Sequence, residues 1–469
     1  MKNKKKNQIL ENIRLLSAGA KGVSVGKTEA GKTVLVSGAV PGDLVNARVR
    51  KSKSNYFEAE AIEILEYSEN RVDPKCIHFG TCGGCKWQNI AYEKQLDFKH
   101  DEVVNNITRI GGVSGFDIIP ILGSEEQYFY RNKMEFSFSN ARWLTQYEIS
   151  SEENFGNKDA LGFHIPGMWS KILDLKECFL QEEPSNQIRL AVKNYSVENG
   201  LEFYDVKAQE GFLRTLMLRQ NSKGEWMVLF QLYKEMKSER IKLFDFLIEK
   251  FPHIKTLVFA INPKGNDSIY DLDIQTYFGE GFLYEEMDGL KFKIGPKSFF
   301  QTNYRQALEL YRKTLEFAEL TGDQIVYDLY TGTGTIAQYV ARNAKHVIGI
   351  EAVQEAIDAA IEHAELNGLD NTTFYAGDMK NVFNDEFLEN HPKADVLITD
   401  PPRDGMHQKV VEQILKLSPE RIVYVSCNSA TQARDIALLK EDYKLVKILP
   451  VDMFPQTHHV ENIALLLKK

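Results

Sequence analysis

Cysteine is scarce in this chain, with only five in 469 residues. A disulfide framework is therefore excluded as the main source of stability, and so few thiols in a long chain are typical of a reducing compartment. No apolar run is long enough to cross a bilayer. The basic start "MKNKKKNQ" is not followed by the apolar core of a secretion signal. We expect a cytoplasmic protein of two to four domains without a membrane partner.

Positive charge is in deficit overall but gathers at one end. The net charge is −9, which excludes a protein that coats nucleic acid with its whole surface. Residues 1–60 carry 12 Lys and Arg against 5 Asp and Glu, a net of +7, so the remainder carries −16. A basic module on an acidic body indicates local phosphate binding. A merely solvated lysine tail is the alternative.

The first 67 residues show a strand pattern. Stretches such as "YFEAEAIEIL" alternate apolar and polar residues and are separated by glycine-rich turns. Several short strands in so few residues predict a small β-barrel of the oligonucleotide-binding (OB) kind over 1–67. The basic stretch "RVRKSKS" could then meet a phosphate backbone, although a β-domain that binds nothing fits as well.

Residues 68–290 predict a mixed α+β central domain. Residues 92–110 have helical spacing and end at a glycine pair, and residues 238–251 form a second amphipathic pattern. The stretches "RNKMEFSFSN" and "EWMVLFQLY" have strand patterns.

Residues 291–469 change to alternating strand and helix patterns. Such βα units predict a doubly wound, mostly parallel α/β sheet of Rossmann-like type. These sheets bind ligands at the carboxyl ends of their strands, and the chemically suggestive residues of this region all lie at predicted strand ends.

The glycine-rich turn "DLYTGTGTIA" indicates a nucleotide-like cofactor. Its Gly-x-Gly-x-x-Ala spacing also fits NAD. Three acids favour S-adenosylmethionine. Asp328 would repel a pyrophosphate but could face an amino group, Glu351 could accept ribose hydroxyls, and Asp378 could reach the adenine.

A cysteine and two acids suggest methylation of a pyrimidine. Cys427 follows a predicted strand and precedes a helix, whose dipole would favour the thiolate. A thiolate that adds to C6 makes C5 nucleophilic toward a methyl sulfonium. A base must then remove the C5 proton, and Glu461 in "HHVEN" is available. In "TDPPRDG", Asp400 ends another strand and Arg403 suits a phosphate or an oxyanion. An inert buried cysteine is the alternative for Cys427.

In motif order and spacing the chain resembles the RNA uracil-5-methyltransferases, and within them the 23S ribosomal RNA enzymes. The motifs are "SFFQTN", "DLYTGTGT", "GIE", "TDPPR", "SCN" and "HVEN". The resemblance covers nearly the whole chain. It implies a TRAM barrel, a central domain with an iron–sulfur site and a class I methyltransferase domain. The implied product is 5-methyluridine in 23S ribosomal RNA.

The resemblance also implies roles for single residues. Cys427 is similar to the family's nucleophile and Glu461 to its base. Thr335 stands where many relatives have Asn. Arg131 and Lys133 match a basic motif and would contact RNA, or else lie on a solvated strand face. The implied cofactor contacts are Gln301, Tyr330, Thr335, Glu351, Asp378 and Asp400.

The remaining cysteines resemble a cluster site. Cys76, Cys82 and Cys85 have the x5 and x2 spacing of the ribosomal enzymes' iron–sulfur motif, and Cys178 stands where those enzymes have a fourth ligand. The resemblance implies a [4Fe–4S] cluster. Four sulfur ligands also suit zinc, and spacing alone favours neither. A thioredoxin-like role for "CGGC" lacks the expected βαβ context.

Three other functions remain open at this stage. Transfer RNA could be the substrate, although that branch typically lacks both the barrel and the cluster cysteines. Radical methylthiolating enzymes need x3 and x2 cysteine spacing, which this chain does not have. A non-catalytic RNA-binding protein would not need Cys427 and Glu461. We expect a monomer without an obligate protein partner.

Overall fold

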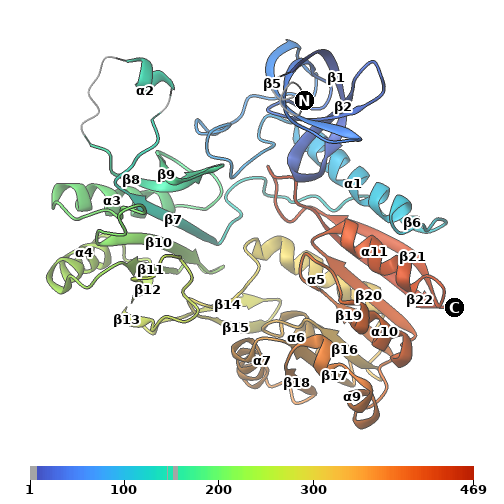
Figure 1. Cartoon of the computed structure of the whole chain (residues 1–469). Helices are drawn as coiled ribbons and strands as arrows, with labels where there is room; N and C mark the ends of the chain where they lie inside the picture. The colour runs from blue at the N-terminus through green and yellow to red at the C-terminus, as the bar shows by residue number, and fades with distance from the viewer. Residues whose placement is uncertain (1–7, 145, 152–156) are drawn as a thin grey trace.

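The computed structural model describes residues 8–144, 146–151 and 157–469. Three sheet-based parts follow one another along the chain (Figure 1). The basic residues Lys2, Lys4, Lys5 and Lys6 lie outside the described residues. No helix in the described part of the chain is long and apolar enough to span a membrane.

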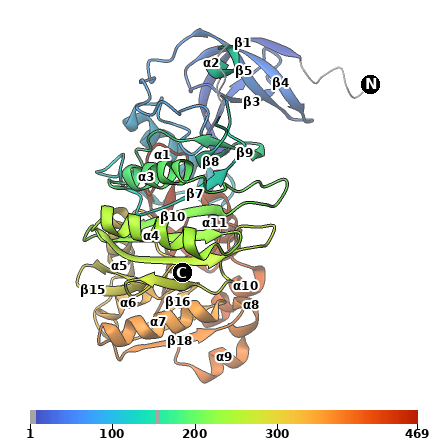
Figure 2. The same ribbon diagram turned by 90° about the vertical axis from the view of Figure 1, so that its left-hand side faces the viewer.

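The N-terminal part is a closed five-stranded barrel, as predicted, with strand order β1-β2-β3-β5-β4. Alternate residues such as Val34, Val36 and Val45 fill its interior. The barrel lies at one end of the molecule (Figure 2). Its strands are β1 (Ile9–Gly19), β2 (Val23–Lys27), β3 (Thr33–Ser37), β4 (Leu44–Ser52) and β5 (Tyr56–Glu66), with a 3-10 turn at Ala20–Gly22.

Much of the barrel's positive charge is neutralised within the barrel. Three cations on β1 and β4 pair with carboxylates on β5: Arg14 with Glu66, Arg50 with Glu60, and Lys51 with Glu58. Exposed pairs of this kind add little stability. They do reduce the charge that the "RVRKSKS" stretch can offer to a phosphate backbone.

The central part is built on a seven-stranded sheet with order β13-β12-β11-β10-β7-β8-β9. Strands β10 and β11 are buried along their whole length because both faces of the sheet are covered. Helices α3 and α4 pack in one apolar cluster, and Met217, Met227 and Leu229 pack in another with Leu283. The elements are β7 (Lys133–Ser139), α2 (Gln146–Ser150), β8 (Ala160–Ile165), β9 (Met168–Asp174), α3 (Ser185–Glu198), β10 (Leu213–Gln220), β11 (Trp226–Leu232), α4 (Lys237–Lys250), β12 (Ile254–Ile261) and β13 (Gln275–Phe278).

The C-terminal part is the predicted doubly wound sheet. Its eight strands have the order β18-β17-β16-β19-β20-β22-β21-β6, and the run from β18 to β20 is parallel. Apolar clusters fill both faces of this sheet beneath the helices. The strands are β16 (Ile325–Leu329), β17 (His346–Glu351), β18 (Thr372–Ala376), β19 (Val396–Thr399), β20 (Arg421–Ser426), β21 (Tyr443–Val451) and β22 (Glu461–Lys468). The helices are α5 (Tyr304–Ala318), α6 (Thr335–Ala341), α7 (Gln354–Leu366), α8 (Met379–Val382), α9 (Asp385–Asn390), α10 (Gln408–Leu417) and α11 (Ser429–Leu439).

Two early elements join this C-terminal sheet. Helix α1 (Tyr92–Arg109) packs against α11, and Val103 and Ile107 are fully buried there. Strand β6 (Asp117–Ile118) pairs in parallel with β21. A hairpin of β14 (Leu283–Met287) and β15 (Leu290–Ile294) packs on α7. The chain therefore passes between the sheets more often than boundaries at 68, 290 and 291 imply.

Candidate active site and cysteine pocket

The chemically suggestive residues meet at one edge of the C-terminal sheet. Glu351 ends β17, Asp400 follows β19 and Cys427 follows β20. Because β22 runs antiparallel to β20, its first residue, Glu461, lies at the same edge. Ser426 pairs with Asn462, which puts Cys427 and Glu461 next to each other across the two strands.

Asp400 and Glu461 lie close enough at this edge for the charge of Asp400 to raise the pKa of Glu461. Burial raises the pKa of Asp400. The pKa of Glu461 is raised by burial and then by the charge of Asp400, while Arg403 opposes the rise. Coupled carboxyl groups of this kind share protons as a pair. The pair can therefore hold or release a proton near neutral pH.

Cys427 is a resting thiol, contrary to the prediction of a favoured thiolate. Burial raises its pKa to about 11, the charges of Glu461 and Asp400 act in the same direction, and Arg403 opposes them. Helix α11 does begin just after the cysteine, with Asn428 capping it by accepting from Ala430 N at 3.2 Å. Burial beside two carboxylates outweighs that helix terminus.

The loop after β19 brings a cation to the cysteine. The carbonyl of Arg403 accepts from Asn428 Nδ2 at 2.9 Å and from Thr431 Oγ1 at 3.2 Å. The Arg403 side chain is exposed, and its charge lowers the pKa of both Cys427 and Glu461.

The glycine-rich turn after β16 lies beside Glu351. One Glu351 oxygen accepts from Gly332 N at 3.2 Å, and the other accepts from Ala352 N at 2.7 Å. Gly334 has a φ of 75°, and a Cβ there would come within 2.9 Å of Ala360 Cβ. Only glycine fits this close approach of turn and helix.

Tyr330 and Asp378, two other predicted cofactor residues, lie near this turn. Tyr330 follows β16 with a φ of 63°. Its pKa is raised by burial first, then by the charges of Asp435 and Asp378. Asp378 caps α8 and pairs with Lys380 at 3.0 Å. The backbone carbonyl of Gln301 accepts from Asn132 Nδ2 at 3.0 Å, which ties this segment to the central part.

Sequence reasoning missed Tyr311 and left Asp328 out of the contact set. Burial raises the pKa of Asp328 to about 7, and the charges of Asp400 and Glu351 add to the rise against the Thr331 hydrogen bond. The hydroxyl of Tyr311 lies 3.3 Å from Thr335 Oγ1. Its helical spacing in α5 marks Tyr311 only as a core residue, so no sequence signal reveals it.

The four remaining cysteines meet in the central part. Cys76, Cys82 and Cys85 lie between β5 and α1, and Cys178 follows β9. All four are reduced and line one cavity of about 610 Å³. Among the described residues, no three or more His, Cys, Asp or Glu side chains are arranged to hold a metal ion.

The cysteine cavity also reaches other predicted residues. Arg131 and Lys133 line it, together with Thr302 and Thr457, which come from the C-terminal part. The cavity therefore extends from the cysteines toward the two segments that carry Gln301 and Glu461.

Comparison with known proteins assigns the family. Residues 280–469 match the family described as tRNA (Uracil-5-)-methyltransferase, and residues 13–62 match the TRAM domain. An uncharacterized RNA methyltransferase of Bacteroides thetaiotaomicron is 50% identical over 436 residues, covering 92% of this chain and 96% of the relative. The chain belongs to the RNA uracil-5-methyltransferase family.

Further RNA methyltransferases are similar over their full length. An uncharacterized RNA methyltransferase of Chlorobaculum tepidum is 43% identical, covering 98% of this chain and 96% of the relative. Among solved structures, the Pyrococcus abyssi tRNA (uracil-54, C5)-methyltransferase with S-adenosyl-L-homocysteine has a TM-score of 0.74 at 29% identity. It covers 97% of this chain, and 99% of its own chain is covered. The C-terminal part of this family member has the fold of S-adenosylmethionine-dependent methyltransferases.

Proposed function

We propose that this protein transfers a methyl group from S-adenosylmethionine to C5 of a uridine in 23S ribosomal RNA. The observation that carries the proposal is the position of Cys427 beside Glu461 at the carboxyl edge of a methyltransferase sheet. A nucleophile and a base on one edge are the two groups that this substitution needs.

In the proposed reaction, the Cys427 thiol gives its proton to solvent water, and Sγ bonds to C6 of the uracil. Arg403, which lowers the pKa of this thiol, stabilises the thiolate as it forms. The electron pair released to C5 takes the methyl group, and the bound cofactor supplies that group on a cationic sulfonium. The Glu461 carboxylate then removes the C5 proton, and the electrons of the C–H bond expel Sγ.

The residues at the sheet edge fit a cationic cofactor. The carboxyl groups of Asp328, Asp400 and Glu351 gather there, and a cation beside them would favour their charged forms, because burial and the charges of Asp400 and Glu351 raise the pKa of Asp328. In the proposal, Glu351 at the end of β17 accepts the ribose hydroxyls. The proposed contacts are Gln301, Tyr330, Thr335, Glu351, Asp378 and Asp400.

We further propose that Cys76, Cys82, Cys85 and Cys178 hold a [4Fe–4S] cluster. Four reduced thiols line one cavity, which suits thiolate ligation. The charges of Cys76, Cys82 and Cys85 each raise the pKa of Cys178 after burial, so the four thiols are close enough to interact. The cluster would order the loop and takes no part in the methyl transfer.

Transfer RNA is the second candidate substrate. The expectation against it depended partly on the barrel, which the transfer-RNA branch typically lacks. The Pyrococcus abyssi tRNA (uracil-54, C5)-methyltransferase aligns with 97% of this chain, a share that includes the barrel. The barrel therefore does not separate the two substrates.

The test is methylation with labelled S-adenosylmethionine and unmodified 23S RNA or transfer RNA, with products resolved as nucleosides. We expect labelled 5-methyluridine from 23S RNA, lost in Cys427→Ala, and a trapped protein–RNA adduct in Glu461→Gln. Label on transfer RNA alone would replace the proposed substrate. Methylation that persists in Cys427→Ala would reject the covalent mechanism, and no label from folded protein would reject the function. Iron and sulfide analysis after anaerobic purification tests the cluster.

A further inference from the structure

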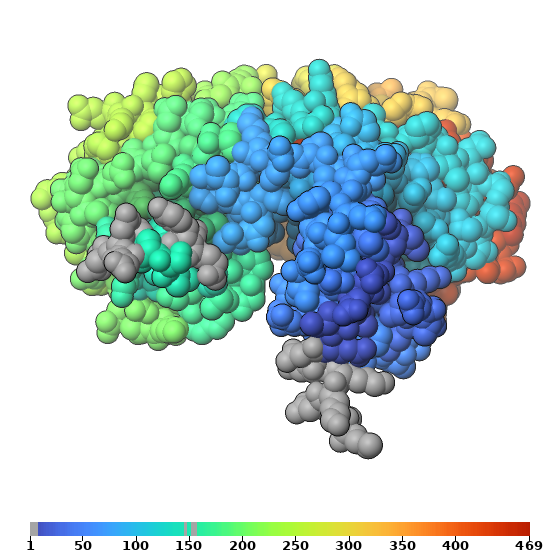
Figure 3. Space-filling view, turned by 90° about the horizontal axis from the view of Figure 1, so that it is seen from above, coloured from blue at the N-terminus to red at the C-terminus, as the bar shows by residue number. Residues whose placement is uncertain are grey.

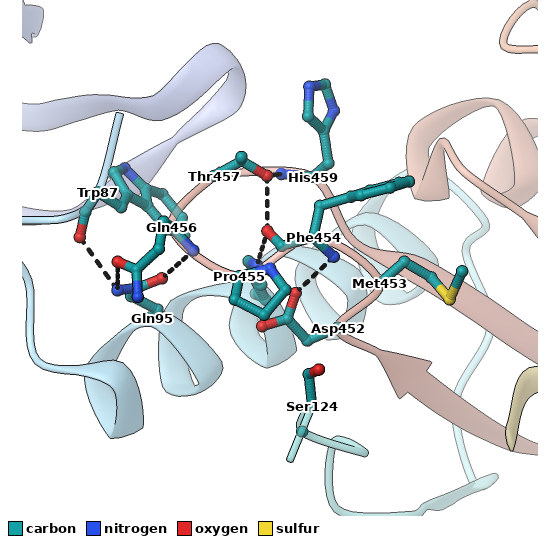
Figure 4. Close-up of polar contacts among 12 residues, drawn as sticks. Trp87, Gln95, Ser124, Asp452, Met453, Phe454, Pro455, Gln456, Thr457 and His459 are labelled. Carbon is teal, nitrogen blue, oxygen red and sulfur yellow. Dashed lines mark hydrogen bonds and ion pairs between the residues drawn. The ribbon is translucent and has the colours of Figure 1, made fainter. Parts of the chain in front are cut away.

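The loop that leads into Glu461 connects β21 to β22. Val451 at the end of β21 pairs with Glu461 at the start of β22, so residues 452–460 close this hairpin. The path of the loop affects the position of Glu461, the first residue of β22, at the edge of the C-terminal sheet that also carries Cys427. Figure 4 shows the loop packed against α1 and the segment around Trp87.

One residue in this loop has a strained backbone. Gln456 is 3% exposed and has a φ of 67°, which a non-glycine residue rarely adopts. Its carbonyl accepts from both Lys86 N and Trp87 N at 3.0 Å. Strain of this kind persists only where the surroundings over-determine it, and it gathers at functional sites.

Gln95 of α1 supplies the rest of that restraint (Figure 4). Its Oε1 accepts from Gln456 N at 2.9 Å, and its Nε2 donates to Gln456 Oε1 at 3.0 Å. The same Nε2 lies 3.0 Å from Trp87 O and 2.9 Å from Ile90 O, so its two N–H bonds are shared among three acceptors. Trp87 O also accepts from Ile90 N at 3.0 Å. Gln456 N and Oε1 are therefore the buried groups that depend most on Gln95.

The two halves of the loop have separate anchors. Lys99 Nζ donates to Asp452 Oδ1 at 2.6 Å, and Tyr130 OH donates to Pro455 O at 2.9 Å, which fixes the first half. Gln95 fixes Gln456, from which the chain runs directly to Glu461. In the half that runs to Glu461, Gln456 is held by the side-chain amide of Gln95 and by the backbone N–H groups of Lys86 and Trp87.

We propose that Gln95, acting through Gln456, is a positioning residue for Glu461. The inference rests on the proposed function, because Glu461 matters here as the base that removes the C5 proton. Gln95 also ties the loop to the segment just after Cys85, so the cysteine pocket and the base share one support.

The test is Gln95→Leu, which keeps the volume and removes the amide. Proton removal follows methyl transfer, so the variant should still methylate the first equivalent of RNA at the wild-type rate. Release should slow by about tenfold to a hundredfold, as small displacements of a catalytic group do. A methylated protein–RNA adduct that survives denaturation should therefore accumulate, as in Glu461→Gln.

The matched control is Gln231→Leu. Gln231 is also a buried glutamine, accepting from Asn262 Nδ2 at 2.8 Å, and it lies in the central sheet. It should lose stability without accumulating adduct. Equal slowing of methyl transfer and release in Gln95→Leu, or release at the wild-type rate, would overturn the inference.

Two further readouts separate the possible failures. If Gln95→Leu does not fold, Gln456→Gly keeps the backbone bonds, relieves the strained φ and loses the side-chain link, and it should also accumulate adduct. Release from this variant at the wild-type rate would count against the inference. If wild type forms neither product nor adduct, the proposed function fails. If Glu461→Gln traps adduct and neither Gln95→Leu nor Gln456→Gly does, only the positioning role fails.

Discussion

At the scale of single residues, Cys427, the proposed nucleophile, has a pKa that burial raises to about 11. A thiol of this kind is safe from oxidation at rest, because the thiolate is the reactive form. Its activation must then come from neighbouring groups at the moment of reaction, and Arg403 is the described cation that acts on it.

The first prediction concerns the pH dependence of Cys427 in the free protein. Below a raised pKa, the thiolate fraction grows about tenfold for each pH unit. The rate of Cys427 alkylation by iodoacetamide should therefore rise from pH 7 to pH 10 without a plateau. Mass spectrometry of the peptide that contains Cys427 measures this rate. A plateau below pH 9 would show that the thiol ionises far more easily than its burial implies.

The second prediction concerns Arg403. Replacing it with Ala removes the charge that lowers the pKa of Cys427, so alkylation at pH 8.5 should slow about two- to tenfold. Arg403→Lys keeps a charge and should recover most of the rate. Equal rates in wild type and Arg403→Ala would mean that water screens this cation completely.

At the scale of elements, the cysteine loop depends on one tight contact with the turn between β8 and β9. Gly83 has a φ of 73°, and a Cβ there would lie 2.2 Å from Pro166 Cγ. Gly80 in the same loop has a φ of 83° but nothing within 4 Å of an added Cβ. Substitution of either glycine would therefore place a side chain at a positive φ. Only substitution of Gly83 would also create a contact with Pro166.

This pair gives the third prediction. Gly80→Ala should cost about 1–2 kcal/mol, the usual penalty for a left-handed non-glycine residue. Gly83→Ala should cost more, because the loop must move away from Pro166, and it should lower the iron content that the proposed cluster would give the purified protein. The melting temperature and the iron content of both variants are measured. Equal changes in the two variants would show that the contact with Pro166 has no effect.

The sequence predicts elements better than it predicts their partners. Alternation and glycine-rich turns identify the barrel, and strand-end acids identify the active edge, because both signals are local. Helix α1 packs beside the C-terminal sheet and β6 pairs with it. Both positions depend on contacts with elements far later in the sequence, α11 and β21. The raised pKa of Cys427 depends on how deeply Asp400 and Glu461 are buried, which only the packed structure determines.

At the scale of the whole molecule, a buried ion pair joins the early and late parts of the chain. Lys99 and Asp452 are both fully buried, and Tyr92 OH donates to the second Asp452 oxygen at 3.0 Å. Breaking such a pair leaves an uncompensated charge in the interior. The barrel, the segment around Trp87 and the sheet edge that carries Glu461 all adjoin this ion pair. The space-filling view shows a notch between the barrel and the central part (Figure 3).

The fourth prediction is a double-mutant cycle on this pair. Lys99→Met alone should destabilise the protein by about 3–5 kcal/mol, since Asp452 is left buried and charged. Adding Asp452→Asn removes that charge and should cost less than the sum of the single changes. Urea unfolding midpoints provide the measurement. Strict additivity would show that water reaches the pair.

The same contact sets an order in time when the chain is made. Lys99 and Asp452 are separated by 353 residues, which takes roughly 20–70 s to synthesise at about 5–20 residues per second. Until α11 is made, near the end of that interval, Val103 and Ile107 of α1 lack this packing partner, so the apolar face of α1 stays available to chaperones. Gln95 can bind the loop only when Gln456 has emerged. A chain released before that point lacks both this loop and Glu461, the proposed base, so we expect it not to methylate RNA.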